Sequence, residues 1–292
     1  MDRRNFLNLG AGALLTSLII KSNTAFPLPK KVKDIVIQLY TLRDLLAKDL
    51  EGTLKKVSDI GYRNIELFGY GEGKYFGKSV TEMRKMTDDM GLNVVSAHYL
   101  SGQGSNTWGT PVNQWEKAVE DAAKMGQKYM AVAFLMPNER KVISDYNKVA
   151  DILNKAGEIS SKYGITMAYH NHDFEFIPLD GQIPMDVLLK NTAADLVKFE
   201  LDIYWIKKAG LDPIQFFKQN KGRVPLWHVK DMEKDSGDFA PVGDGVIDWT
   251  TIFQEEKTAG LTHFFVEQDN HKYGTPLGNV EKSLKWLRSF DY

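Results

Sequence analysis

Short apolar segments alternate with amphipathic segments along most of the chain. Eight apolar runs predict strands, at residues 34–40, 64–67, 93–98, 129–134, 166–170, 197–201, 224–229 and 263–267. Between these runs, apolar residues recur at helical spacing in residues 51–60, 80–90, 115–125, 145–163 and 280–290. Ser79 and Glu82 form a capping box at the start of the second of these helices. Strands this short and this apolar are typical of a buried parallel sheet.

A glycine follows the end of several predicted helices and precedes the next strand. The intervals from Gly61 to Gly91, Gly126 and Gly164 are 30, 35 and 38 residues, about one βα unit each. Glycine at the end of a helix adopts the left-handed conformation that other residues resist. Eight such units predict an α/β fold, a closed (β/α)8 TIM barrel.

The alternative fold is an open, doubly wound sheet. No G-x-G-x-x-G motif follows the first strand, which argues against a dinucleotide-binding sheet of that kind. Residues 69–73, Gly-Tyr-Gly-Glu-Gly, lack the third glycine of the motif, so we expect a flexible loop there.

The first 25 residues read as a targeting segment. Arg3 and Arg4 precede Phe-Leu and an apolar run over residues 7–20, which resembles a twin-arginine export signal. An attached membrane anchor is the alternative, but the run is shorter than the roughly 20 residues that span a bilayer. We therefore expect residues 1–25 to be a signal peptide, residues 26–292 to be a single catalytic domain, and the mature protein to be periplasmic without stable membrane insertion.

The composition is that of an ordinary globular protein. The 292 residues include 37 Lys and Arg against 38 Asp and Glu, a net charge of −1, which makes nucleic acid an unlikely partner. Cysteine is absent, so disulfides, thiol nucleophiles and cysteine metal sites are excluded. Neither a G-x-S-x-G nucleophile elbow nor a P-loop is present.

Polar residues gather where the predicted strands end. In a (β/α)8 barrel these ends meet at one rim, which carries the active site. Alternate residues share one face of a strand, so His170 with His172, Glu200 with Asp202, and His228 with Lys230 are expected to point together. Any one of them alone is more readily a capping or ion-pairing residue, and it is the whole set that indicates a site. The set comprises Gln38, Glu66, His98, His170, His172, Asp202, His228, Lys230 and Glu267.

Carboxylate and imidazole ligands on the last three strands suit Mn²⁺, Mg²⁺, Co²⁺ or Zn²⁺. Such an ion holds adjacent sugar oxygens and polarises a carbonyl, and a nearby histidine or carboxylate then moves the proton. Glycosidase chemistry stays open as well, because Glu200, Asp202 and Glu267 could supply a carboxylate pair.

The sequence resembles the xylose-isomerase-like barrel superfamily, in its sugar phosphate isomerase/epimerase group, over about residues 36–288. The resemblance is carried by segments 37–43, 61–66, 96–98, 169–176, 200–202, 227–231, 241–249 and 265–267. It implies one divalent metal ion held by Glu, Asp, His and Glu on strands five to eight. Asp202, His228 and Glu267 match the last three of these ligands.

Strand five departs from that pattern. Family members often have Glu-Asn-His where this chain has His170-Asn171-His172. Either His170 takes the ligand position or Glu175 folds back to supply it, and we expect Glu175, which restores the charge balance of two glutamates. The departure puts a proton shuttle between two glutamates in doubt and adds imidazole bases.

We therefore expect His170, His172 and Glu267 to move protons. Lys230 either stabilises an enolate or pairs with Asp231. Gln38, Glu66, His98 and Trp205 are expected to contact substrate, although His98 would equally suit core packing and a tryptophan in such a barrel is more often a packing residue.

The predicted function is a metal-dependent carbohydrate enzyme that abstracts a proton next to the carbonyl of a hydroxy-ketone, a sugar isomerase or epimerase. The alternative is a 3-keto-glycoside lyase or keto-glucal hydratase, because the His-Asn-His form with an export signal resembles exported relatives of that kind. A hypothesis of another class is a non-catalytic periplasmic sugar-binding protein. The expected partner is a small sugar, and a homo-oligomer is compatible with the sequence. The sequence does not identify the sugar or the metal.

Overall fold

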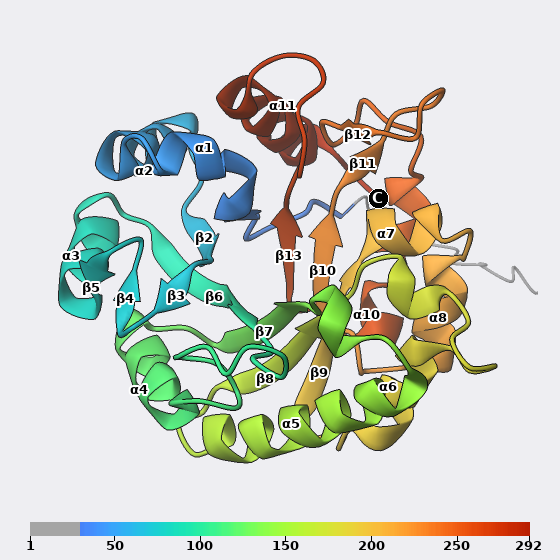
Figure 1. Ribbon diagram of the computed structural model, residues 1–292. Coiled ribbons are helices and arrows are strands. Elements are labelled where there is room, and N and C mark those ends of the chain that lie inside the picture. Colours follow the sequence, from blue (N-terminus) through green and yellow to red (C-terminus); the bar gives the residue numbers. More distant parts are fainter. Residues whose placement is uncertain (1–29) are drawn as a thin grey trace, which may run out of the picture.

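Eight parallel strands close into a barrel in the order β1-β13-β10-β9-β8-β7-β6-β2. The computed structural model describes residues 30–292 (Figure 1). The predicted signal peptide, residues 1–25, lies outside the described residues. The strands are β1 (Val36–Gln38), β2 (Asn64–Leu67), β6 (Asn93–Leu100), β7 (Tyr129–Phe134), β8 (Thr166–His170), β9 (Val197–Asp202), β10 (Leu226–Val229) and β13 (His263–Val266). The predicted (β/α)8 barrel is confirmed, and the carboxyl ends of its strands meet at one end, the mouth.

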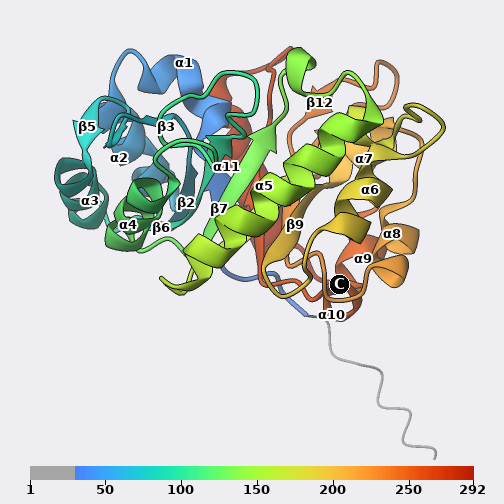
Figure 2. The same ribbon diagram turned by 60° about the horizontal axis from the view of Figure 1, so that its bottom comes forward.

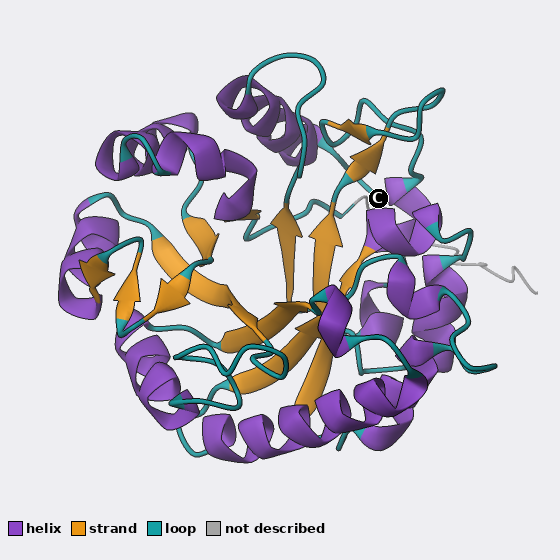
Figure 3. Cartoon of the chain, in the orientation of Figure 1, coloured by secondary structure: helices purple, strands orange, loops and turns teal. Residues whose placement is uncertain are grey.

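Helices surround the ring of strands (Figure 3). They are α1 (Arg43–Leu46), α2 (Leu50–Ile60), α3 (Val80–Asp89), α4 (Trp115–Met125), α5 (Ile143–Ser161), α6 (Pro184–Asn191), α7 (Ile203–Lys208), α8 (Pro213–Gln219), α9 (Trp249–Phe253), α10 (Glu256–Ala259) and α11 (Pro276–Ser289). The helix α5 crosses the outside of the barrel diagonally (Figure 2). No helix in residues 30–292 is long and apolar enough to cross a bilayer.

The predicted signals at the helix ends are present. The Ser79 side chain accepts a hydrogen bond from the Glu82 backbone, and the Glu82 carboxylate accepts one from the Ser79 backbone. Gly61 and Gly126 follow α2 and α4 with φ angles of 116° and 83°, the left-handed conformation that ends each helix.

Two predictions of local structure are wrong. The first strand ends at Gln38, because the Gln38 side chain accepts a hydrogen bond from the Tyr40 backbone and begins a 3-10 helix, η1 (Leu39–Leu42). The glycine-rich segment 69–73 is not a simple loop. It enters a small antiparallel sheet of β3 (Tyr70–Gly71), β4 (Lys74–Tyr75) and β5 (Lys78–Ser79). Tyr75 anchors this sheet, since its buried hydroxyl lies 2.9 Å from the hydroxyl of Tyr99.

Two further 3-10 helices, η2 (Pro137–Glu139) and η3 (Phe174–Phe176), follow β7 and β8. A second small sheet, β11 (Asp231–Met232) with β12 (Phe239–Ala240), follows β10.

The interior of the barrel changes from apolar to polar along the strands. One buried cluster consists of Val36, Val95, Ala131, Ala168, Leu226 and Phe265. Because alternate residues share a face, the next inward positions toward the mouth are polar, for example His170 after Ala168 and His228 after Leu226. The apolar layer therefore supports a polar layer, which carries the candidate site.

Candidate metal and catalytic centre

Four side chains meet at the mouth of the barrel, one from each of β8, β9, β10 and the end of β13. We call His170, Asp202, His228 and Glu267 the mouth cluster. Each offers one potential ligand atom, and these atoms all lie within 4.8 Å of one another. All four residues are buried. The structure thus brings together the three residues predicted from strands six to eight, with imidazole and carboxylate donors that suit a divalent ion.

Local structure orients these side chains. His228 pairs in register with Asp202, which ends β9 and caps α7 by accepting a hydrogen bond from the Trp205 backbone at 3.0 Å. The Oδ1 atom of Asp202 is occupied by this cap, so its Oδ2 atom faces the cluster, 3.3 Å from His170 Nε2.

Lys230 lies among the carboxylates of the mouth. Its ammonium is 2.9 Å from Asp202 Oδ2, 2.7 Å from Glu267 Oε2 and 2.9 Å from Asp269 Oδ1. Burial would lower the pKa of Lys230, but Asp202, Asp269 and Glu267 together hold it well above its usual value. Lys230 is therefore a permanent positive charge at the mouth.

Asp231 has a different role from the ion pair considered from sequence. Its carboxylate accepts hydrogen bonds from the backbone of Gly243 and Ile247 and from the Trp249 indole, which organises the loop after β12.

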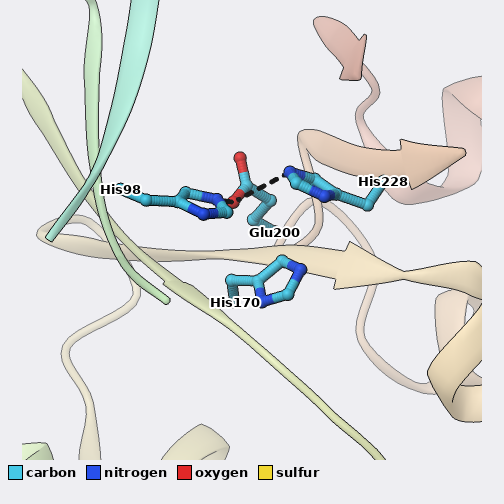
Figure 4. A group of neighbouring side chains, drawn as sticks. All are labelled: His98, His170, Glu200 and His228. Carbon is cyan, nitrogen blue, oxygen red and sulfur yellow. Dashed lines mark hydrogen bonds and ion pairs between the residues drawn. The ribbon is translucent and has the colours of Figure 1, made fainter. Parts of the chain in front are cut away.

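A second group lies one layer deeper in the barrel. We call Glu66, His98, Glu200 and His228 the deep cluster; Figure 4 shows three of its members beside His170. The Nε2 atom of His98 is 2.8 Å from Glu200 Oε2 and 3.3 Å from Glu66 Oε2. The Nε2 atom of His228 is 3.1 Å from Glu66 Oε2 and 3.4 Å from Glu200 Oε2. His228 thus joins the two clusters, because its Nδ1 atom lies 2.7 Å from Glu267 Oε2.

Gln38 completes the deep cluster by donating a hydrogen bond to Glu66 at 2.7 Å. Gln38 and Glu66 have no exposed surface, whereas 11% of the His98 side chain is exposed. The contact of these three residues with substrate stays a prediction, and His98 is the one that solvent reaches.

The negative charge of the carboxylates in the deep cluster is compensated by neighbouring imidazoles. Burial and the neighbouring Glu200 raise the pKa of Glu66. Burial opposes ionisation of Glu200 as well, but His228 and His98 lower its pKa overall. In His228, the effect of burial is outweighed by Glu200 and Glu267, which raise its pKa well above the usual value.

Residues 54–290 match the protein family described as xylose isomerase-like TIM barrel. The chain belongs to this family. A sugar phosphate isomerase/epimerase from Parabacteroides distasonis, known as a crystal structure, is 30% identical with a TM-score of 0.75, over 87% of this chain and 93% of that one. Among curated proteins, the inosose dehydratase of Clostridium botulinum is 22% identical over 271 residues, covering 82% of this chain and 88% of the relative.

A crystal structure of an IOLI protein with a bound zinc atom shares the fold, with 18% identity and a TM-score of 0.67 over 86% of this chain and 95% of that one. A protein that shares this fold therefore holds zinc.

In this xylose isomerase-like barrel, the imidazoles of the strand-five histidines are neutral. Burial and His228 lower the pKa of His170 to about 4, and burial and His170 lower the pKa of His172 to about 2. The His172 ring stacks on Phe174 and lies 5.3 Å from the ring of Trp205. Neither His172 Nδ1 nor Trp205 Nε1 has a hydrogen-bond partner. Both atoms are thus free for a substrate hydroxyl, while the Trp205 ring also packs against the protein.

The prediction that Glu175 supplies the strand-five ligand is not supported. Two groups of side chains have potential ligand atoms close enough to share an ion: the mouth cluster, and a second group of His98, His170, Glu200 and His228. Glu175 belongs to neither of these groups of potential ligands, whereas the alternative, His170, belongs to both. The Glu175 carboxylate accepts hydrogen bonds from the Tyr169 hydroxyl at 2.6 Å and from the His172 backbone at 2.8 Å. The physical reason is strand alternation: Tyr169 points away from the barrel interior, and η3 carries Glu175 to that outer side.

Asp269 is a residue of the site that the sequence analysis missed. Burial raises its pKa to about 7 despite the opposing effect of Lys230, and the neighbouring Glu267 and Asp202 raise it further. Its side chain is 20% exposed at the mouth. The spacing that linked His228 with Lys230 could have identified it, because Asp269 lies two residues after Glu267.

We expect Glu175→Gln to keep its metal and His228→Ala to lose it. His228 belongs to both groups of potential ligands, while Glu175 belongs to neither. Elemental analysis of the purified variants should find about one ion per chain in Glu175→Gln and roughly a tenth of that or less in His228→Ala. Loss of metal from Glu175→Gln would restore the original strand-five assignment.

The buried Glu175 carboxyl also predicts a pH dependence of stability. Burial raises its pKa to about 7 from 4.5, so the folded protein holds this proton more tightly than the unfolded chain. The associated stability is full below pH 4.5 and is lost as the pH rises through 7. Urea unfolding at pH 5 and pH 8 should show the wild type losing roughly 2–3 kcal/mol more than Glu175→Gln. Equal losses in both proteins would show that Glu175 is not the group responsible.

Proposed function

We propose that this protein removes a proton from the carbon next to the ketone of a small polyhydroxylated substrate, such as a keto-sugar, with the help of a divalent ion. The main observation in support is the arrangement of charges at the mouth, where the Lys230 ammonium lies beside neutral imidazoles and buried carboxylates. The relatives support it, since they are described as a sugar phosphate isomerase/epimerase and an inosose dehydratase.

Each group at the mouth has a chemical role that fits this step. The neutral imidazoles of His172 and His170 can accept the proton from carbon. Glu267 is ionised, because Lys230 and His228 lower its pKa well below the usual value in spite of burial, and it is a further candidate base. The Lys230 ammonium can stabilise the negative oxygen of the resulting enolate. A divalent ion held by the carboxylates and imidazoles around His228 would polarise the carbonyl and acidify the neighbouring C–H bond.

The fate of the enolate separates the candidate reactions. Return of the proton to carbon gives isomerisation or epimerisation, while loss of the β-substituent gives an unsaturated ketone and requires an acid for the departing oxygen. Asp269 can be that acid, because its pKa of about 7 leaves a large protonated fraction near neutral pH. This observation supports β-elimination, or the reverse hydration, as a second candidate function.

Proton abstraction is tested in deuterium oxide with a 3-keto-glucoside and with an inosose. We expect deuterium to enter at the carbon next to the ketone, as followed by NMR. Released aglycone or water then indicates elimination, and a retained aglycone with altered configuration indicates epimerisation. Absence of both exchange and bound metal would favour a non-catalytic sugar-binding protein.

His172→Gln should slow the deuterium exchange by roughly 100- to 10,000-fold, the usual contribution of a positioned base. The variant should keep its metal, because His172 belongs to neither group of potential ligands. His263→Gln is the matched control: His263 begins β13, at the opposite end of the strand from Glu267. Equal exchange rates in the two variants would remove His172 from the reaction.

We also propose that the protein is exported by a twin-arginine route, on the basis of Arg3 and Arg4 ahead of the apolar run. In a bacterial host with that route, replacing both with lysine should leave the protein in the cytoplasm, as measured by fractionation. A double variant of Lys30 and Lys31 to arginine, outside the signal, should be exported normally. Export that survives the loss of both Arg3 and Arg4 would contradict the proposal.

A further inference from the structure

We propose that the mouth has a second subsite, in which a ring attached to the keto-sugar packs against Tyr40, Phe68 and Phe76. Its ligand is an uncharged ring with an apolar face, an aryl group or a second sugar, joined to the keto-sugar through a glycosidic oxygen. The inference rests on the proposed function, because it extends the substrate of that reaction by one ring.

The three aromatic side chains form a continuous row. The ring of Phe68 packs edge to face with the rings of Tyr40 and Phe76, at 5.3 and 4.9 Å between ring centroids. We call Tyr40, Phe68 and Phe76 the aromatic row. Tyr40 lies in η1 after β1, and Phe68 directly follows β2, the neighbouring strand of the barrel. The row therefore lies at the carboxyl ends of adjacent strands, the end of such a barrel that binds substrate.

Hydrogen bonds hold Tyr40 beside the candidate site. The Gln38 side chain accepts a hydrogen bond from the Tyr40 backbone at 2.9 Å and donates one to Glu66 at 2.7 Å. The Arg43 guanidinium lies 4.5 Å from the centre of the Tyr40 ring and donates to the backbone carbonyl of Asp269 at 2.8 Å. One end of the row is thus held next to Asp269, so a group that projects from a bound keto-sugar on this side would meet it.

The chemistry of this surface suits an uncharged ring better than a phosphate. Tyr40 is 42% exposed although its ring contacts Phe68 and Arg43. Aromatic side chains bind flat apolar surfaces well, and a tyrosine also has a hydroxyl for a polar edge. Arg43 donates to the Tyr40 carbonyl as well, at 3.1 Å, and Lys230 already lies among three carboxylates. Both cations are therefore engaged within the protein.

The backbone at Phe76 is strained, and this strain supports a functional role. Phe76 and Gly77 form the two-residue turn between β4 and β5, with φ angles of 51° and 77°. Such turns favour asparagine, aspartate or glycine at the first position, because a bulky side chain is disfavoured in the left-handed region. Strain of this kind is concentrated at ligand-binding and catalytic sites. A phenylalanine is nevertheless present here, at one end of the aromatic row.

The test measures binding of methyl glucoside, phenyl glucoside and cellobiose by calorimetry. These ligands lack the ketone and cannot form the enolate, so the measurement reports binding alone. We expect phenyl glucoside, cellobiose or both to bind roughly 10-fold or more tightly than methyl glucoside, because a ring gains stacking and apolar contact. Tighter binding of phenyl glucoside identifies an aryl group as the preferred ring, and tighter binding of cellobiose identifies a sugar. Equal binding of all three ligands overturns the proposal.

Tyr40→Ala should remove most of this preference, so that the three ligands bind within about threefold of one another. Tyr163→Ala is the matched control. Tyr163 has a similar exposure, 39%, and lies between α5 and β8, at the end of the barrel opposite the mouth. This control should keep the preference of the wild type. A preference that survives in Tyr40→Ala, or that is lost equally in both variants, overturns the proposal.

Phe76→Asn separates ligand binding from packing. Asparagine is favoured at this turn position, so we expect the melting temperature not to fall while the preference for the ring decreases. Loss of the preference with an undiminished melting temperature supports the subsite. An intact preference removes Phe76 from the subsite.

The deuterium-exchange assay tests the proposed function separately, because calorimetry requires no turnover. Ring preference without exchange would contradict the proposed reaction and leave the subsite standing. Exchange on a 3-keto-glucoside without any ring preference would leave the reaction standing and remove this inference.

Discussion

The burial of four carboxylates in a region that holds a single lysine is the constraint on which the rest of the site depends. Glu66, Glu200, Asp202 and Glu267 are buried in the upper barrel, and Asp269 lies partly exposed beside them. Among residues 30–292, Lys230 is the only lysine or arginine that pairs with any of the five, and it contacts Asp202, Glu267 and Asp269. Buried negative charge is stable only when cations or protons compensate it. The histidines supply part of this balance, which explains why the pKa of His228 is raised while the pKa of His170, in contact with one carboxylate, is lowered. A divalent ion would supply the rest of the compensating positive charge.

Because alternate residues of a strand face the barrel interior, these charged side chains lie in two layers that differ in chemistry. Glu200 and Asp202 are two residues apart on β9, and they face the same interior at different depths. The deeper layer is closed except at His98 and has donors for an ion. The outer layer has the lysine, the neutral imidazoles and Asp269, which are groups that can hold or move a proton. His228 connects the layers through its two ring nitrogens, so a change of charge in one layer affects the other.

The chain belongs to the xylose isomerase-like barrels, and strand five is where it departs from the expected pattern. His170 belongs to both groups of potential ligands, and His172 stays outside them with a free Nδ1 atom. A change from carboxylate to imidazole at this strand removes one negative charge from the mouth.

The sequence by itself determined the barrel and the end of it that carries the site, because hydrophobic period, capping residues and glycines after helices are local signals. It also identified Asp202, His228 and Glu267 as neighbours, since strand ends converge in any closed parallel barrel. Only the tertiary structure decided that Glu175 binds Tyr169 outside the barrel, that Asp269 joins Lys230, and that Glu66 and His98 meet Glu200 below the mouth. Glu175 is only six residues from Tyr169, but the side of the strand on which it lies depends on the turn made by η3. The other contacts link residues far apart in the chain, and their distances depend on barrel closure and on the depth of each side chain, which no local pattern records.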